Sequence, residues 1–145
     1  MDKMVSAIMQ KSLITVNVDD PVEKVERLLR THRLTCVPVL DDDGHCYGLI
    51  NASHLIEFHM TRKNAMALKA WEVCLNKVLS VNFNMRVRDA AELMIRKQVH
   101  HLLVVDAGQV HGLVTSLDLV RELLSTLDPT FQGATDAKGL YAGLI

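Results

Sequence analysis

The sequence contains an internal repeat, which limits the folds open to it. Three apolar segments recur in the same order, 64 or 65 residues further along the chain: 13–18 with 78–83, 37–41 with 102–106, and 48–50 with 112–114. The one-residue difference falls at a glycine-containing turn, where a hairpin tolerates a change in length. We infer a duplication, with residues 5–58 as the first copy and 70–125 as the second.

Each copy has the pattern of three short strands and two helices. Apolar residues at helical spacing predict an amphipathic helix in both copies: Val22, Val25, Leu28 and Leu29, then Val87, Ala90, Leu93 and Met94. Paired strands and a second helix are expected to follow, at 36–41, 46–50 and 52–59 in the first copy and at 101–106, 110–114 and 116–127 in the second. The sequence therefore predicts an α/β fold of two βαββα units with pseudo-twofold symmetry, because one unit alone would leave an apolar sheet face uncovered.

The segments around these elements carry further signals. We expect Asp20 to cap the first helix, with Pro21 as the first helical residue and Glu23 completing a capping box. Residues 59–69 are rich in helix formers, which predicts a helical connector. Residues 126–145 are rich in glycine and small polar residues, which favours a mobile tail. The tail also has apolar residues suited to packing across the module or onto a second copy: Phe131, Leu140, Tyr141, Leu144 and Ile145.

Charge and composition exclude several classes of function. The formal net charge of -1 leaves no basic excess for a phosphate backbone, so nucleic acid is not an expected partner. The chain has neither a signal-peptide pattern nor a run of about 18 apolar residues, so no membrane association is expected. Cys36, Cys46 and Cys74 are odd in number and form no Cys-x-x-Cys pair, which argues against a disulfide framework or a zinc site. These features favour a soluble cytoplasmic protein.

Three short motifs resemble those of a known family. They are Val-Pro-Val at 37–39, Gly-Leu-Ile at 48–50 and, above all, Gly-Leu-Val-Thr-Ser-Leu-Asp at 112–118. Each half resembles a CBS domain, the cystathionine-β-synthase-type repeat, and the tandem resembles the Bateman module that two such domains form. The resemblance implies a stand-alone regulatory module, and not an enzyme, that binds an adenosine-containing molecule and changes the activity or assembly of a partner protein. We also expect a homodimer that packs through its helical faces.

Thr115 and Asp118 are the strongest candidate binding residues. A ribose presents a cis-diol, whose two donors a single carboxylate can accept together, and a hydroxyl one helical turn away can add a third bond. The same spacing is that of a helix N-cap and its capping box. The two roles are compatible, and within a CBS-like frame the ribose role is favoured.

The resemblance implies that the first copy completes this site. Ile14 and Leu34 match positions whose side chains sandwich the adenine, and Thr35 matches the position whose backbone reads the edge of the base. His101, with Arg33 nearby, matches the phosphate-facing position, and the charge of a histidine changes near neutral pH. Ile14 and Leu34 are equally typical of ordinary core residues.

The equivalent site of the first copy departs from the family pattern. Asn51 stands where the second copy has Thr115, and His54 where it has Asp118. A neutral imidazole accepts one hydrogen bond and cannot clamp a diol. We therefore expect one competent site and one weak or empty site, with Asn51 as a helix cap.

Other chemistries find little support in the sequence. His100 and His101 are neighbours on a predicted strand and should point to opposite faces, so no metal site is expected. Motifs for nucleophilic, metal-dependent or phosphate-cradling catalysis are absent from the sequence. The expected ligand is an adenine nucleotide (AMP, ADP or ATP), although S-adenosylmethionine and NAD present the same ribose and base, and no cofactor is expected. A ligand-free dimerisation module is the alternative.

Overall fold

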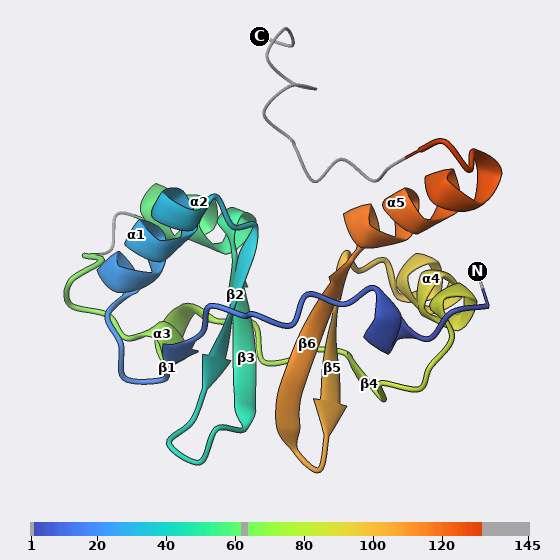
Figure 1. Cartoon of the computed structure of the whole chain (residues 1–145). Helices are drawn as coiled ribbons and strands as arrows, with labels where there is room; N and C mark the ends of the chain where they lie inside the picture. Colours follow the sequence, from blue (N-terminus) through green and yellow to red (C-terminus); the bar gives the residue numbers. More distant parts are fainter. Residues whose placement is uncertain (1, 62–63, 132–145) are drawn as a thin grey trace, which may run out of the picture.

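The computed structural model describes residues 2–61 and 64–131, and its elements form two units in the same order, strand, helix, strand, strand and helix (Figure 1). The first unit contains β1 (Val16–Asn17), α1 (Val22–His32), β2 (Cys36–Leu40), β3 (Cys46–Asn51) and α2 (Ala52–Met60). The second contains β4 (Ser80–Val81), α4 (Val87–Lys97), β5 (His101–Asp106), β6 (Gln109–Thr115) and α5 (Ser116–Leu127). A short helix precedes each unit: η1 (Val5–Ala7) and α3 (Ala70–Val73). The tail predicted over 126–145 lies outside the described residues from 132 onward.

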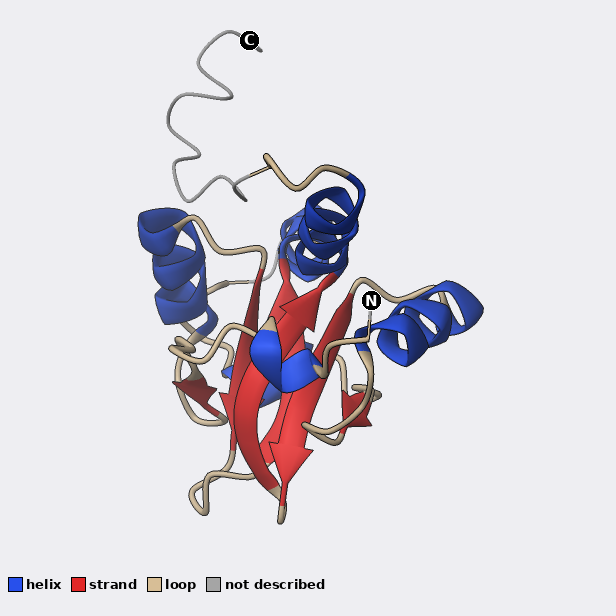
Figure 2. Ribbon diagram, turned by 45° about the vertical axis from the view of Figure 1, so that its right-hand side comes forward, coloured by secondary structure: helices blue, strands red, loops and turns tan. Residues whose placement is uncertain are grey.

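Each unit is built on its own three-stranded sheet, ordered β1-β2-β3 and β4-β5-β6. The first two strands of each sheet are parallel and the last two are antiparallel. Figure 2 shows the two sheets together in the middle of the molecule, with the longer helices around them. The predicted α/β fold of two βαββα units is confirmed.

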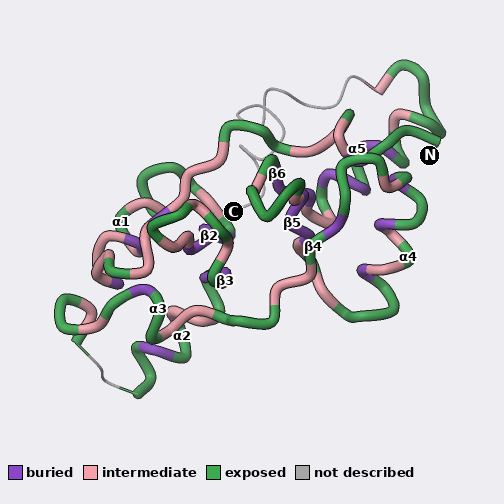
Figure 3. The backbone as a smooth tube through the Cα atoms, turned by 90° about the horizontal axis from the view of Figure 1, so that it is seen from below, coloured by how far each residue is buried: buried purple, intermediate pink, exposed green. Residues whose placement is uncertain are grey.

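The amphipathic helices bury the predicted faces. α1 buries Val22, Val25 and Leu29, and α4 buries Val87, Ala90 and Met94. Both helices end in a residue with left-handed backbone, Arg33 and Gln98, each with φ of 53°. Buried positions, drawn purple in Figure 3, also follow the strands. The two units therefore repeat each other down to the way their first helix ends.

α1 begins differently from the prediction. The helix starts at Val22, with Pro21 as its N-cap, and no side chain caps it. The carboxylate of Asp20 instead accepts a hydrogen bond from the N–H of Asn17 at 2.8 Å. The expected Asp20 cap and its capping box are therefore wrong, because the tight turn before the helix uses that carboxylate.

The helical connector predicted over 59–69 is not a helix at residues 64–69. Residues 65–67 form a turn, and Lys69 pairs with Pro21. The carbonyl of Leu68 accepts from the N–H of Val22 at 2.9 Å, and the carbonyl of Ala65 accepts from the N–H of Glu23 at 3.0 Å. These carbonyls satisfy the first amides of α1, which have no partner inside their own helix. Because they are used in this way, the connector does not form its own helical hydrogen bonds despite its composition.

Each unit is completed by the segment that precedes the other unit. Val5 of η1 is buried in the core of the second unit, and Ala70 of α3 is buried in the core of the first. The residues that follow extend the two sheets in the same reciprocal way: Gln10 pairs with Leu113 of β6, and Leu75 pairs with Leu49 of β3. The first residues of each sequence repeat therefore pack with the other unit and not with their own.

Two glycines allow this close approach. A Cβ at Gly112 would lie 3.0 Å from the carbonyl oxygen of Gln10 and 2.5 Å from Sδ of Met9. A Cβ at Gly48 would lie 2.7 Å from the carbonyl oxygen of Leu75. Both positions need glycine because another stretch of backbone packs against the strand there.

A third apolar cluster joins the two sheets. Its buried members are Cys36 and Leu49 from the first unit and Leu103 and Leu113 from the second. Burial raises the pKa of the Cys36 thiol to about 11, so this side chain is a neutral core residue near pH 7. The shared cluster holds the units together along the side of the cavity described next.

Candidate ligand-binding site

A cavity of about 370 Å³ lies between the two units, beside the start of α5. Both copies form its walls: Gln10, Arg33, Leu34 and Thr35 from the first, and His100, His101, Thr115, Ser116, Leu117 and Arg121 from the second. A cavity of this size falls within the range of small-molecule sites. It brings together most of the residues predicted for the site, although they come from segments far apart in the sequence.

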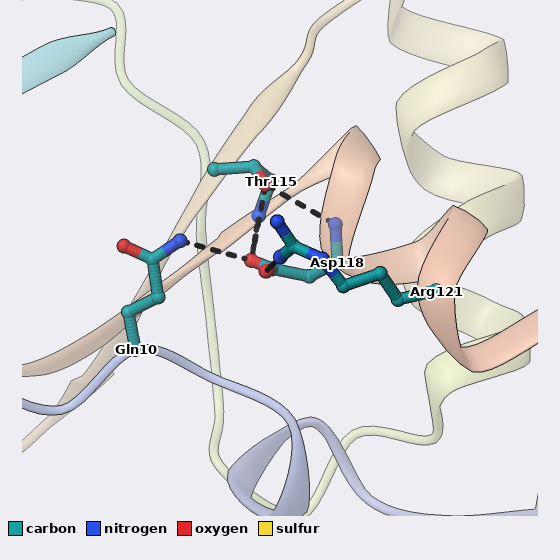
Figure 4. Close-up of polar contacts among 4 residues, drawn as sticks. All are labelled: Gln10, Thr115, Asp118 and Arg121. Atoms are coloured by element: carbon teal, nitrogen blue, oxygen red, sulfur yellow. Dashed lines mark hydrogen bonds and ion pairs between the residues drawn. The ribbon is translucent and has the colours of Figure 1, made fainter. Parts of the chain in front are cut away.

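Asp118 contacts three of the residues that line the cavity and is only 7% exposed (Figure 4). Its Oδ2 accepts hydrogen bonds from the N–H of Thr115 at 2.8 Å and from the Thr115 hydroxyl at 3.0 Å. Oγ1 of Thr115 in turn accepts from the N–H of Asp118 at 3.2 Å. These contacts form the capping box of α5, which is one of the two roles considered for this pair.

Arg121 and Gln10 also contact this carboxylate, and neither was predicted as a site residue. Arg121 donates from Nη1 to Oδ1 of Asp118 at 3.1 Å, and Nε2 of Gln10 lies 3.5 Å from Oδ2. Arg121 follows Asp118 by three positions, a spacing that places two helical side chains side by side. Gln10 reaches the site only because its backbone pairs with Leu113, which no local pattern indicates.

The end of α1 supplies the wall from the first copy. The left-handed backbone of Arg33 turns the chain, so that Arg33, Leu34 and Thr35 all line the cavity. Leu34 also packs against the core of the first unit, so both roles proposed for it are compatible. Ile14 is half-buried before β1 and is not among the residues that line this cavity.

His101 faces Thr35 across the boundary between the copies. Its Nε2 lies 3.4 Å from the Thr35 hydroxyl. Burial lowers the pKa of His101, the neighbouring His100 lowers it further, and Asp118 opposes the shift. His100 and His101 line the same cavity, contrary to the prediction of opposite faces, because β5 begins at His101 and strand alternation does not extend to His100.

The first copy carries a different capping box at the equivalent position. Oδ1 of Asn51 accepts from the N–H of His54, and Nδ1 of His54 accepts from the N–H of Asn51, both at 3.1 Å. The predicted cap role of Asn51 is confirmed. Burial lowers the pKa of His54, although Glu57 opposes the shift. A neutral imidazole thus takes the place that a carboxylate has in the second copy.

The space beside Asn51 is smaller than the main cavity. It measures about 200 Å³, and its polar lining comes from Asn51, Lys77, Gln98, His100 and His101. His54 instead borders a separate space of about 180 Å³, together with Glu57 and Glu72. Asn51 and His54 therefore border two separate spaces.

An acidic turn and an apolar groove are the other notable surfaces of the described residues. Asp41, Asp43 and His45 gather their ligand atoms within 4.8 Å of one another at the β2–β3 turn, where Oδ1 of Asp41 accepts from the N–H groups of Asp43 and His45. The groove, of about 620 Å³, lies between α4 and α5 and is lined mainly by apolar residues. Its wall includes Ile95, which is 79% exposed.

Among the described residues, no helix has the length and apolar character needed to cross a membrane.

The fold and the cavity define a class of protein: a tandem of two α/β repeats with a cavity between them. The family model of the CBS domain matches the chain twice, over residues 5–60 and 70–125. The chain therefore belongs to the CBS domain family, and its two units are tandem CBS repeats.

Two curated relatives are matched over most of their own length. An uncharacterized protein of Methanocaldococcus jannaschii is 27% identical over 154 aligned positions, which cover 83% of this chain and 91% of the relative. A CBS domain-containing protein of Dictyostelium discoideum is 29% identical over 140 positions, which cover 89% and 97%.

Solved structures show the same fold. The CBS domain of a bacterial CNNM/CorC family Mg2+ transporter in complex with ATP has a TM-score of 0.75 at 24% identity, with 84% of this chain and 87% of that chain covered. CBSX2 in complex with AMP has 0.74 at 23%, with 86% and 98% covered. The CBS domain pair of MJ0100 in complex with 5'-methylthioadenosine and S-adenosyl-L-methionine has 0.78 at 22%, with 87% and 99% covered.

Proposed function

We propose that this chain is a regulatory module that binds an adenosine-containing nucleotide in the cavity between its two repeats. The observation that carries the proposal is a ligand-sized cavity built from both copies, three of whose lining residues contact the buried carboxylate of Asp118. ATP, AMP, 5'-methylthioadenosine and S-adenosylmethionine are the ligands in the three similar structures, and an adenosine group is common to all of them.

The lining residues suit the parts of such a ligand. Asp118 and Thr115 accept the ribose hydroxyls, Leu34 packs against the base, and the backbone of Thr35 reads its edge. Arg33 and His101 face the phosphate, and protonation of His101 strengthens that contact. Ile14 has no part in this proposal, since it does not line the cavity.

Regulation follows from the position of the cavity. A ligand that contacts both repeats binds best to one relative arrangement of the two, and so shifts the population toward that arrangement. A partner protein that distinguishes the arrangements then responds to the ligand. In this proposal the module senses the nucleotide and does not transform it.

Thermal denaturation with added ligands tests the proposal. AMP, ADP, ATP, S-adenosylmethionine and NAD are compared with GMP, which has the same ribose and phosphate but another base. A ligand that binds only the native state adds about 2.7 kcal/mol of stability at a hundred times its Kd. We expect at least one adenosine compound to raise the Tm and GMP to leave it unchanged. If none of the five raises the Tm, the proposed function is wrong.

A dimerisation module is the second candidate function, and the groove between α4 and α5 favours it. Ile95, Val120 and Leu123 line this groove and are exposed, and a second copy would cover them. Leu123→Glu places a charge in the groove and should reduce the molecular mass measured by light scattering from dimer to monomer. Met66→Glu, at an exposed position outside the groove, is the control. A Leu123→Glu protein that remains dimeric would exclude this interface.

A further inference from the structure

The carboxylate of Asp118 has little capacity left for a ligand. A carboxylate offers about four acceptor positions. The N–H and hydroxyl of Thr115 use two on Oδ2, Arg121 uses one on Oδ1, and Gln10 adds a longer contact at 3.5 Å. A ribose diol brings two donors. Both hydroxyls can therefore reach this carboxylate only if one of its present partners moves away.

Arg121 is the partner that has to move, because it is bound to Oδ1, whereas Gln10 contacts Oδ2, which both groups of Thr115 already occupy. The two groups of Thr115 belong to the capping box of α5, so their loss would open the first turn of the helix. The Arg121 side chain is 46% exposed, whereas that of Asp118 is 7% exposed. The guanidinium therefore regains water when it leaves, and a ribose hydroxyl replaces it as a partner of the buried carboxylate. Since Arg121 also lines the cavity, it stays beside the ligand after it moves.

The charge of the ligand decides whether this exchange is favourable. Arg33 and Arg121 are the permanently charged residues in the cavity wall. The pKa of His101 is lowered, so that ring is largely neutral near pH 7. A neutral nucleoside takes the carboxylate from Arg121 and offers no anion in exchange. A 5'-phosphate offers the guanidinium a new anionic partner, with which it can form two parallel hydrogen bonds.

We propose that Arg121 is a specificity-determining residue, which releases Asp118 to the ribose, pairs with the phosphate of the same ligand, and so selects phosphorylated over neutral adenosine compounds. This inference rests on the proposed function and adds the means by which the same site discriminates among adenosine compounds.

Isothermal titration of the full chain with adenosine and with AMP provides the test. Arg121→Gln keeps a polar side chain of similar length but removes the charge. We expect it to weaken AMP binding by about tenfold, because one charge-assisted pair is lost, and to leave adenosine binding unchanged or tighter, because Asp118 is free. Arg88→Gln is the matched control, since Arg88 is an exposed helical arginine that pairs with Glu92 away from the cavity. It should change neither affinity.

The outcomes separate this inference from the proposed function. If Arg121→Gln changes the affinities for adenosine and AMP by the same factor, Arg121 only supports the fold of the site and the inference is wrong. The same holds if neither affinity changes. If neither compound binds the unaltered protein, the selectivity assigned to Arg121 is wrong, whereas the proposed function is decided by the thermal comparison of the five adenosine compounds.

Discussion

The side chain of Asp118 completes the capping box of α5 and contacts three of the residues that line the cavity. In Asp118→Asn one oxygen remains to accept from Thr115, but the negative charge is lost. Because a hydrogen bond to a charged acceptor contributes about 2 kcal/mol, the affinity for an adenine nucleotide should fall roughly thirtyfold. Isothermal titration measures the affinity, and the Tm without ligand shows how much of the change reflects helix stability.

His54→Asn is the internal control for this prediction, because His54 holds the equivalent place in the first copy. It should change nucleotide affinity far less, since His54 bonds to Asn51, which does not line the main cavity, whereas Asp118 contacts three residues that do. Equal losses in the two variants would mean that the ligand does not bind at Asp118.

Site residues were predictable where a local pattern carries them. The heptapeptide that ends in Asp118 identified the start of α5, and Arg121 was within reach of the same argument because it lies one helical turn further on. Gln10 could not be predicted in this way, since it reaches the site through pairing with a strand far away in the sequence. Ile14 was placed by the resemblance to CBS domain pairs, and small shifts in how a segment packs are invisible to such a resemblance.

Among the helices, α2 and α5 start with the same kind of capping box but respond differently to pH. Nδ1 of His54 accepts from the N–H of Asn51 only while that nitrogen is unprotonated. The pKa values of His54 and His101 are both lowered from 6.5. The unfolded chain therefore binds more protons than the folded chain below about pH 6.5, so stability falls as pH falls through that range.

We expect the Tm to decrease between about pH 7.5 and about pH 5.5, and His54→Asp to reduce that decrease by about 4 °C, the equivalent of one helix cap. An aspartate stays ionised in this range, so its cap survives. Glu57 raises the pKa of His54 against the effect of burial and so makes the decrease smaller. His111→Asn, at an exposed position on β6, should leave the decrease unchanged. If the Tm falls equally in the unaltered and the His54→Asp proteins, the decrease arises from groups other than His54.

The glycines of β3 and β6 allow a second prediction about elements. A methyl group at Gly48 meets the backbone of Leu75, which cannot move without breaking its pairing with Leu49. A methyl group at Gly112 mainly meets the flexible side chain of Met9. Gly48→Ala should therefore lower the free energy of unfolding by about 1–3 kcal/mol, and Gly112→Ala by less, as measured by urea denaturation. The reverse order would mean that the backbone near Leu75 yields more readily than the structure indicates.

Helices and strands were predictable from periodicity, but their ends and connections depended on distant partners. The strand pairs and the two amphipathic helices follow apolar patterns that are complete within each copy. The connector has the composition of a helix, yet its carbonyls serve α1. Asp20 has the chemistry of a cap, yet a nearby turn uses its carboxylate. In both places a hydrogen-bond partner from another segment outweighed local propensity.

Across the whole molecule, the reciprocal packing of η1 and α3 predicts cooperative unfolding. Neither unit can keep its core intact after the other unfolds, because each core contains a residue from the segment that precedes the other unit. Trp71, the single tryptophan, lies on α3 and reports on the first unit by fluorescence, whereas far-UV circular dichroism reports on both. The two signals should show one common midpoint in urea. Two separate midpoints would mean that the units unfold independently.

The pairing of Gln10 with Leu113 also affects the order in which the protein can assemble during translation. The ribosome makes residues 5–10 about a hundred residues before the strand that receives them, an interval on the order of 5–20 s at usual elongation rates. The first sheet receives α3 and Leu75 soon after β3 has been made, whereas the second sheet must wait for its own strands before Val5 has a core to enter. Residues near the amino end are therefore among the last to be packed, and until then nascent-chain chaperones meet an apolar segment that the finished protein hides.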